Sequence, residues 1–231
     1  MALGYQNPDD MDFTVSNVLY KAVHEETIIP EEGILTTAEG IDLMPSNIQL
    51  SGYEISLINE YGREVVLKQY IDEVRLNYDF ILIDCAPSLS VLTVNALVAS
   101  DSVLIPTQPQ YFSMAGIQMF YETFCKIRKK MNPYLSIEGV LVTMMDKRPN
   151  FTKDLVAQLR ESYGDVFKVF ETEIPTSIRM SESNARGKSI FAFDPKGKVA
   201  AAYEKLTQEV IDNGRERQEV QRELRPVQTA R

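Results

Sequence analysis

The chain has 231 residues, of which 44% are hydrophobic and 25% charged, a balance typical of a globular protein with a substantial core. Its net charge of −9 excludes a surface that attracts nucleic acid as a whole, so DNA contacts require a local basic patch or a dimer that concentrates one. Two cysteines and a single histidine exclude a disulfide framework, a histidine-based metal site and a histidine-dependent triad.

The first third of the chain predicts short helices around one strand. Apolar residues with a helical period predict a helix over residues 13–23, and residues 41–45 predict a short strand. Ser46-Asn47 is a helix cap, and helices are predicted over 48–59 and 63–76.

A continuous apolar run follows at residues 78–84 and ends in a carboxylate. The run Phe80-Ile81-Leu82-Ile83 precedes Asp84 and a turn that contains Pro87, which predicts a strand buried on both faces. Ligands of open α/β sheets bind beyond the carboxyl ends of the strands, so Asp84 could hold Mg²⁺ beside a phosphate, the Walker B role. The alternative interpretation is an aspartate that caps the next helix or faces water.

The remaining elements continue the alternation of helix and strand. In chain order we predict helix 90–99, strand 102–106, helix 113–130, strand 137–145, helix 151–163, strand 166–170, an irregular stretch over 174–195 and a final amphipathic helix over 199–211. The basic end of helix 113–130, Lys126 to Lys130, suits the helix dipole, and we interpret it as a solvated helix end. The whole pattern predicts one α/β domain over 1–214, with a mostly parallel sheet between helix layers, and a charged tail over 215–231.

Targeting signals and phosphate-binding loops have recognisable sequence patterns. No signal peptide and no apolar run of about 18 residues is found, which predicts a cytoplasmic protein. Gly187-Lys188-Ser189 matches the end of a G-x-x-x-x-G-K-[ST] loop, but Glu182 occupies the first glycine position and neither flank fits. Gly197-Lys198 fails as well, because Val199 replaces Ser or Thr.

Several segments together resemble the ParA/Soj family of deviant Walker ATPases, which is related to MinD. Their order and spacing carry the resemblance, which runs from about residue 13 to residue 213. The matching segments are residues 40–47, 78–88 (Walker B and switch II), 103–109, 111–116, 139–148 and the I-P…R-x-S-E…G-K…D-P-K signature within 174–196.

The resemblance implies a three-layer, P-loop NTPase-like fold and a set of site residues. Asp84 would be the catalytic and metal residue, with ATP and Mg²⁺ as cofactors. The other nucleotide-binding residues would be Pro87, Met145, Asp146, Ile174 and Pro175. Arg148 and Arg179 would contact DNA non-specifically in an ATP-bound homodimer. The alternative for these arginines is surface ion pairing with Asp146 and Glu182.

The resemblance also implies a role in partitioning plasmids or chromosomes, at the nucleoid, with a ParB-like centromere-binding partner and no membrane contact. The family's K-G-G-x-G-K-T-T loop is not found, so we expect a chain without its own P-loop, a fragment or split product that does not hydrolyse ATP alone. Alternatives are a degenerate, non-hydrolysing regulator, a nucleotide-independent DNA adaptor, and a MinD-like cell-division ATPase. The mixed charges after Gly214 argue against the membrane helix that a MinD-like protein needs.

Overall fold

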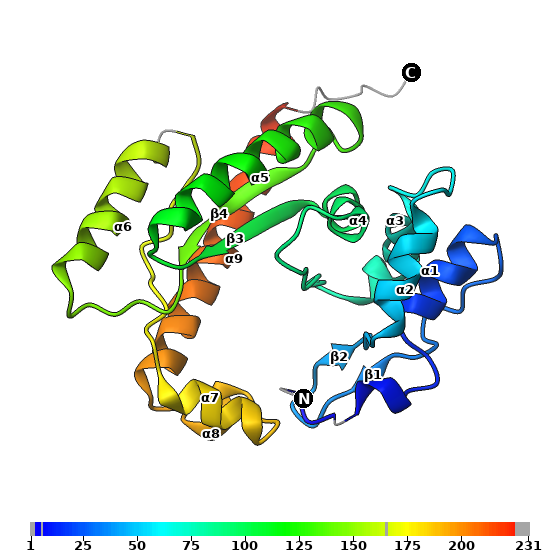
Figure 1. The fold of residues 1–231 in the computed structure, drawn as a ribbon, viewed down its shortest axis with the longest axis horizontal. Helices are drawn as coiled ribbons and strands as arrows, with labels where there is room; N and C mark the ends of the chain where they lie inside the picture. Colours follow the sequence, from blue (N-terminus) through cyan, green and yellow to red (C-terminus); the bar gives the residue numbers. More distant parts are fainter. Residues whose placement is uncertain (1–2, 6, 165, 225–231) are drawn as a thin grey trace. The chain divides into compact units, whose positions relative to one another are not determined.

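The computed structural model describes residues 3–5, 7–164 and 166–224. Its helices and strands alternate strictly only between residues 91 and 163, and elsewhere mostly helices follow one another (Figure 1). They are η1 (Pro8–Asp10), α1 (Val15–Val23), β1 (Leu35–Thr36), β2 (Asp42–Leu43), α2 (Gln49–Leu57), α3 (Val66–Val74), η2 (Arg75–Asn77), α4 (Val91–Ala99), β3 (Ser102–Thr107), α5 (Tyr111–Lys130), β4 (Ser136–Val142), α6 (Asn150–Tyr163), α7 (Ile178–Ala185), α8 (Ile190–Phe193) and α9 (Lys198–Leu224).

The chain divides into two compact units. The first contains Met1–Val103, Gly116–Ser136 and Ser183–Ser189, and the second contains Leu104–Ala115, Ile137–Glu182 and the chain from Ile190 onward. None of the helices in the described part of the chain is long and apolar enough to cross a membrane.

The first unit is a helical cluster around α1. Thr14 begins this helix with a capping box, because its side chain accepts from the Ser16 N–H while Asn17 Oδ1 accepts from the Thr14 N–H. Leu19 packs in one apolar cluster and Val18 in a second, so adjacent positions of α1 serve two sides of the core. The helix predicted over residues 13–23 is confirmed.

A small hairpin accounts for the strand predicted over residues 41–45. Strands β1 and β2 pair antiparallel, with Leu35 opposite Leu43. After β2, Asn47 Oδ1 accepts from the Gln49 N–H at 3.1 Å in the manner of a cap, but the N-cap residue of α2 is Ile48, which makes no side-chain capping bond.

Two side-chain amides position α4 within the first unit. The buried Asn95 accepts from the Leu67 N–H at 3.0 Å and donates to the carbonyl oxygens of Arg63 and Val91 at 2.6 and 2.9 Å. Asn132, just after α5, lies within hydrogen-bond distance of three carbonyls at the end of α4. They are those of Leu97 (3.1 Å), Val98 (3.2 Å) and Ser100 (2.7 Å).

The strand predicted over residues 78–84 is wrong. This segment has no strand assignment, and its side chains are largely uncovered: Phe80 is 69% exposed and Leu82 is 93% exposed. The physical reason is that no strand in the described residues pairs with this segment, so neither a hydrogen-bond ladder nor a covering helix layer forms on it. The apolar side chains make burial of this segment favourable, but burial also requires a neighbouring strand or helix that covers it.

Strands β3 and β4 form a parallel pair, most of which lies in the second unit. Backbone hydrogen bonds advance together along both strands, from Ser136 N–H with Asp101 O at 3.1 Å to Thr143 N–H with Thr107 O at 2.8 Å. Leu141 of β4 belongs to a core cluster with α9, whereas the neighbouring Val142 faces residues of α6. Since alternate residues of a strand point to opposite faces, β4 is covered by helices on both faces, as predicted.

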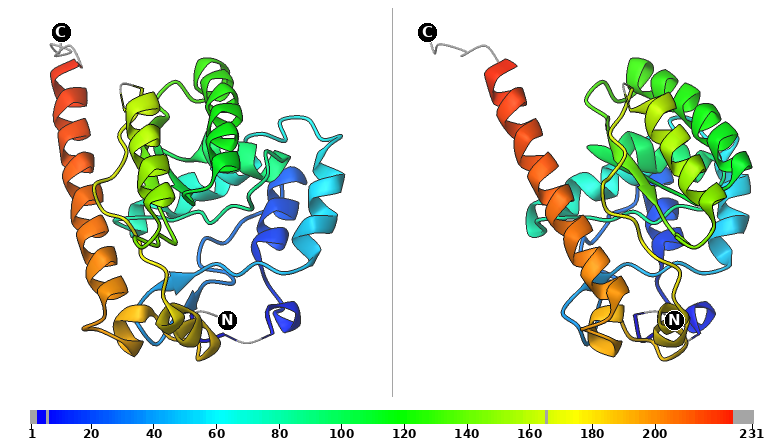
Figure 2. Two further views of the ribbon diagram at one scale, coloured as in Figure 1. Left: turned by 60° about the vertical axis from the view of Figure 1, so that its left-hand side comes forward. Right: turned by 90° about the vertical axis from the view of Figure 1, so that its left-hand side faces the viewer.

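The C-terminal half differs from prediction in three places. The strand predicted over 166–170 is reduced to one parallel bridge between Val169 and Val140, and the stretch predicted as irregular contains α7 and α8. Helix α9 runs through Gly214 as far as Leu224, visible as one continuous helix in Figure 2. The predicted charged tail therefore begins inside a helix, and its residues 225–231 lie outside the described residues.

Candidate functional site

Asp84 lies in the extended segment between η2 and α4 of the first unit. Its side chain is exposed, and among the described residues no ion pair or hydrogen bond is found for its carboxylate. No group of three or more His, Cys, Asp or Glu side chains in the described chain is placed to hold a metal ion. Nucleotide-bound Mg²⁺ is usually held by one or two carboxylates together with phosphates, so a magnesium role for Asp84 needs no such protein cluster and stays a prediction.

The turn after Asp84 is anchored to α4. The Ser88 N–H donates to Ala86 O at 2.7 Å around Pro87, and the buried Thr93 hydroxyl donates to Ser88 O at 2.6 Å. Although Cys85 is exposed, partial desolvation by neighbouring atoms and, to a smaller extent, the charge of Asp84 raise the pKa of its thiol, which disfavours the nucleophilic thiolate. Sequence reasoning missed Thr93, because a threonine in an apolar helix gives no sign of which carbonyl it will reach.

Three of the residues expected to bind the nucleotide, Met145, Ile174 and Pro175, come together in the second unit. Met145 and Pro175 form a parallel bridge, in which the Met145 N–H donates to Ile174 O at 2.9 Å and the Thr176 N–H donates to Met145 O at 3.1 Å. The residue before the bridge, Met144, has φ of 52°, an uncommon conformation for a residue that is not glycine.

Burial divides these residues into supporting and accessible ones. Met145 and Ile174 are buried and their backbone groups are already paired, so they hold the bridge in place. Pro175 is half-buried and offers an uncharged ring surface. Asp84 and Pro87 belong to the first unit and the bridge to the second, so each group is described in its own unit.

Asp146 and Arg148 form a bidentate ion pair at the surface. Arg148 Nε donates to Asp146 Oδ1 at 2.9 Å and Nη2 donates to Oδ2 at 2.7 Å. The Arg148 hydrogen bonds lower the pKa of Asp146 to about 2, and the same bonds raise the pKa of Arg148. The Arg148 side chain is 90% exposed, so the guanidinium can also be reached from solvent.

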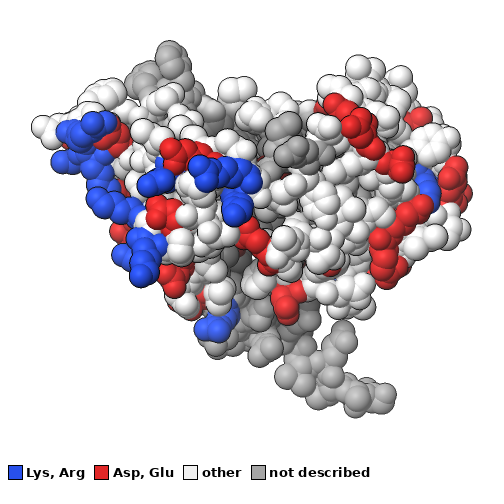
Figure 3. Space-filling model, turned by 90° about the horizontal axis from the view of Figure 1, so that it is seen from below, with Lys and Arg blue, Asp and Glu red and all other residues white. Residues whose placement is uncertain are grey.

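Arg179 is placed in a similar way on α7. Its Nη1 lies 3.2 Å from the Glu182 carboxylate, one turn along the helix, and its guanidinium lies over the Phe193 ring at 5.9 Å. The ion pairs considered from the sequence are thus present for both arginines. On the face shown in Figure 3, Lys and Arg side chains gather in groups flanked by acidic ones.

Comparison with known proteins identifies the family. The family model described as an AAA domain matches residues 1–137. The chain is 44% identical over 179 residues to the sporulation initiation inhibitor protein Soj of Bacillus subtilis, covering 78% of this chain and 70% of that protein. It is 37% identical over 202 residues to the chromosome partitioning protein ParA of Caulobacter vibrioides, covering 87% and 75%.

A solved structure agrees with these relatives. Cobyrinic acid a,c-diamide synthase from Mycobacterium smegmatis, solved with a bound ATP analogue and magnesium, superposes with a TM-score of 0.69 at 31% identity, over 80% of this chain and 72% of that one. The likeness confirms the predicted P-loop NTPase-like α/β fold. Together with the identity to Soj and ParA, it establishes that the chain belongs to the ParA/Soj family of ATPases.

Proposed function

We propose that this chain acts in the partitioning of plasmids or chromosomes as part of a ParA-type ATPase that binds Mg²⁺ and ATP. The observation that supports this most is the exposed Asp84 carboxylate, which has no ion pair or hydrogen bond within the described part of the chain. It lies next to a turn fixed by Thr93, in a chain 44% identical to Soj. Identity to partitioning proteins favours this role over the MinD-like alternative.

Each part of the candidate site has a task in this proposal. Asp84 takes a position in the Mg²⁺ shell, and the turn around Pro87 lies by the phosphates. Pro175 provides an apolar wall for the base, while buried Met145 and Ile174 keep that wall in register. The bound magnesium would supply charge neutralisation of the phosphates, and the chain's own residues orient the nucleotide.

Binding of Mg²⁺·ATP by the 231-residue chain tests this part of the proposal. A fluorescent ATP analogue titrated with and without Mg²⁺ should show magnesium-dependent binding that Asp84→Asn weakens tenfold or more, about 1.4 kcal/mol. Asp79→Asn is the matched control, because Asp79 is an exposed aspartate of the same segment. Equal effects of the two substitutions would remove Asp84 from the metal site.

Hydrolysis must be measured separately, as phosphate release over time. Release above background, lost in Asp84→Asn, would identify the chain as an ATPase on its own. Nucleotide binding without release favours the non-hydrolysing member of the fold considered from the sequence. No binding at all would contradict the nucleotide part of the proposal and favour an interaction protein.

For the DNA contacts we propose Arg148 and Arg179, concentrated by ATP-dependent homodimerisation. Guanidinium groups suit phosphates, but here each is already shared with a carboxylate, so DNA competes with Asp146 and Glu182 for them. In this family such a dimer would work with a ParB-like centromere-binding partner at the nucleoid.

That competition gives the DNA proposal a two-sided test. Fluorescence anisotropy with a duplex of arbitrary sequence should show weaker binding for Arg148→Ala and stronger binding for Asp146→Asn. The slope of log affinity against log salt should fall by about 1 for each arginine–phosphate ion pair that a substitution removes. Lys153→Ala, an exposed lysine of α6, should change little. Weaker binding for Asp146→Asn would contradict the proposed competition.

A further inference from the structure

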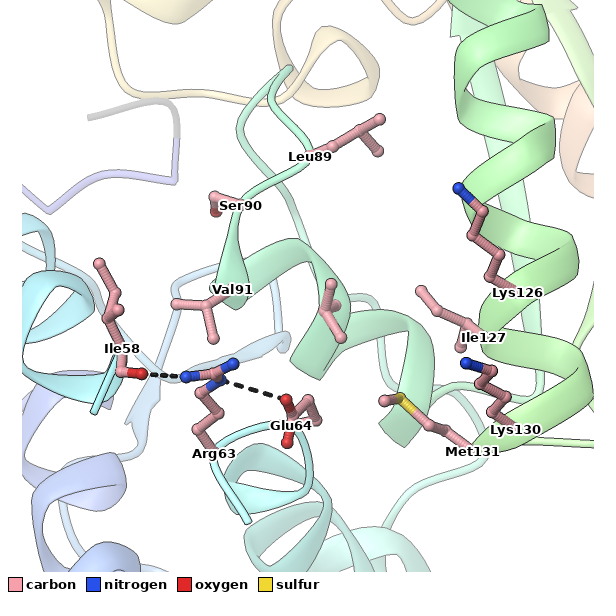
Figure 4. Close-up of a pocket in the computed structure, with 11 residues that line it drawn as sticks. Ile58, Arg63, Glu64, Leu89, Ser90, Val91, Lys126, Ile127, Lys130 and Met131 are labelled. Atoms are coloured by element: carbon pink, nitrogen blue, oxygen red, sulfur yellow. Dashed lines mark hydrogen bonds and ion pairs between the residues drawn. The ribbon is translucent and has the colours of Figure 1, made fainter. Parts of the chain in front are cut away.

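A cleft of about 440 Å³ lies within the first unit, and Asp84, Arg148 and Arg179 are not among its lining residues. The α2–α3 connection, the start of α4 and the C-terminal end of α5 form its walls (Figure 4). Its lining residues are Ile58, Arg63, Glu64, Leu89, Ser90, Val91, Val94, Lys126, Ile127, Lys130 and Met131. This volume is in the range of about 300–1,000 Å³ that ligand clefts occupy.

The cleft has an apolar floor that reaches the surface. Val91 and Val94 of α4 and Ile127 of α5 line its interior, and Ile127 is buried. Leu89 and Met131 at the rim are each 44% exposed. Exposed apolar side chains gathered around a concave floor are typical of a docking site for another apolar surface.

One wall of the cleft carries unbalanced positive charge. Lys126 and Lys130 lie one turn apart on α5, and both side chains project towards α4 in Figure 4. Among the described residues no ion pair or hydrogen bond is found for either ammonium group. On the opposite wall Arg63 donates to Ile58 O and, at 3.1 Å, to Glu64 Oε1, so that arginine is neutralised by its neighbour.

The occupant of such a cleft must be apolar on one side and acidic on its flank. The first 103 residues argue against an extended polyanion, because their basic residues are only Lys21, Arg63, Lys68 and Arg75, although the end of α5 adds Arg128 and Lys129. A long nucleic acid or an anionic membrane would be repelled by the negative charge of this N-terminal part, whereas a short helix contacts only the cleft. Lys126 and Lys130 are about 6 Å apart along the helix axis, which matches carboxylates at i and i+4 of a facing helix.

We propose that this cleft binds an amphipathic helix of a partner protein, about two turns long, with apolar residues on its inner edge and Asp or Glu one turn apart on its flank. The apolar residues enter between α4 and α5, which supplies most of the binding free energy, and the carboxylates pair with Lys126 and Lys130. The charge pairs fix the orientation of the helix and raise its association rate.

A fluorescein-labelled peptide of about 12 residues, roughly 18 Å of helix, tests this proposal with the full chain. The peptide carries Leu at helical spacing on one edge and Glu at i and i+4 beside it. Anisotropy should report saturable binding that the double substitution Lys126→Glu and Lys130→Glu weakens at least tenfold. The matched control is Arg128→Glu with Lys129→Glu, the same charge change on the same helix end outside the cleft, which should stay within about twofold of the wild-type affinity.

Additional substitutions and peptides distinguish this binding mode from a purely electrostatic or purely apolar one. Leu89→Ser with Met131→Gln removes exposed apolar side chains without opening the core, and it should weaken the peptide several-fold. A peptide with the same charges but no leucines should bind weakly, and a Glu-to-Lys peptide should not bind. The proposal is overturned if the wild type does not bind the acidic amphipathic peptide, or if the control pair of substitutions loses as much affinity as the cleft pair. It is also overturned if the leucine-free peptide binds equally well, or if millimolar inorganic phosphate displaces the peptide at constant ionic strength.

Discussion

Individual residues of the second unit are held by charge-assisted hydrogen bonds between neighbours. Asp146 and Arg148 are two residues apart in the loop after β4, and Arg179 and Glu182 are three residues apart on α7, so each pair can form locally. Both pairs were among the alternatives considered from the sequence, because partners this close in sequence meet wherever the backbone turns.

The Asp146 carboxyl should titrate with a pKa of about 2, well below its ordinary value of 3.8. A lowered folded-state pKa stabilises the folded protein above the ordinary value, and that contribution is lost as the pH falls from about 4 to about 2. Carboxyl ¹³C chemical shifts against pH should show this titration in the wild type and a return towards the ordinary pKa in Arg148→Ala. An unchanged pKa in the variant would mean that another group holds the charge.

Glu209 of α9 makes a longer-range contact that the sequence does not reveal. Its carboxylate accepts from the Thr172 N–H at 3.0 Å, from the Glu171 N–H at 3.2 Å and from the Thr172 hydroxyl. Because Thr172 is buried, removing the acceptor leaves its polar groups without a partner, and Glu209→Ala should cost about 2 kcal/mol of stability. Urea denaturation should show this loss of stability. Glu204 is an exposed glutamate of the same helix, so Glu204→Ala should leave the stability unchanged.

At the scale of elements, the segment 78–84 shows what an apolar pattern can and cannot predict. The pattern predicts that a strand here could be buried on two faces, but burial depends on strands and helices elsewhere in the chain. The roles of Asn95 and Asn132 were likewise not predicted, since each side chain bonds to a backbone carbonyl 32 residues away. The partner of Thr93 is only five residues away, but no helical spacing indicates it. Helices with a clear period, such as α1, α5 and α6, were predicted within a few residues.

The uncovered segment should promote self-association. This run has exposed Phe80 and Leu82, and no backbone hydrogen bond is found for it among the described residues, so it is a template for strand addition by another chain. Leu82→Lys should therefore lengthen the lag before light scattering rises at about 37 °C, with no loss of stability in urea. The same change at the exposed Tyr61, outside the segment, serves as control. Equal behaviour of both variants would place the association surface elsewhere.

Strand β4 depends on a glycine at its centre. Gly139 has φ of 154°, and a Cβ there would lie 2.8 Å from Phe170 Cε2 and 3.0 Å from Lys168 O. Gly139→Ala should therefore destabilise the protein by about 1–3 kcal/mol through overpacking. Gly116 in α5 has no atom within 4 Å of such a Cβ, so Gly116→Ala should stabilise by about 0.5–1 kcal/mol. Opposite shifts of the urea midpoint would confirm this contrast, and equal shifts would contradict it.

For the molecule as a whole, the sequence predicted the fold class and the family better than the local detail. Alternating helices and strands predicted the α/β fold, and the order of several weakly specific segments identified the ParA/Soj family. The short helices α7 and α8 were assigned as irregular, because a few residues carry too little periodicity. Of the candidate site, the sequence identified residues that the structure joins at the Met145–Pro175 bridge, but not which of them are buried.

The bonds from Asn132 to the end of α4 also have a consequence for cooperative opening. If the last turn of α5 unwinds, the carbonyls of Leu97, Val98 and Ser100 lose their shared donor, so the two helix ends should unravel as one sub-global unit. Amide hydrogens there should then exchange with deuterium at matching rates. A peptide seated against Lys130 and Met131 would slow exchange at the far end of α4, which it does not touch, and Asn132→Ala would abolish that remote protection.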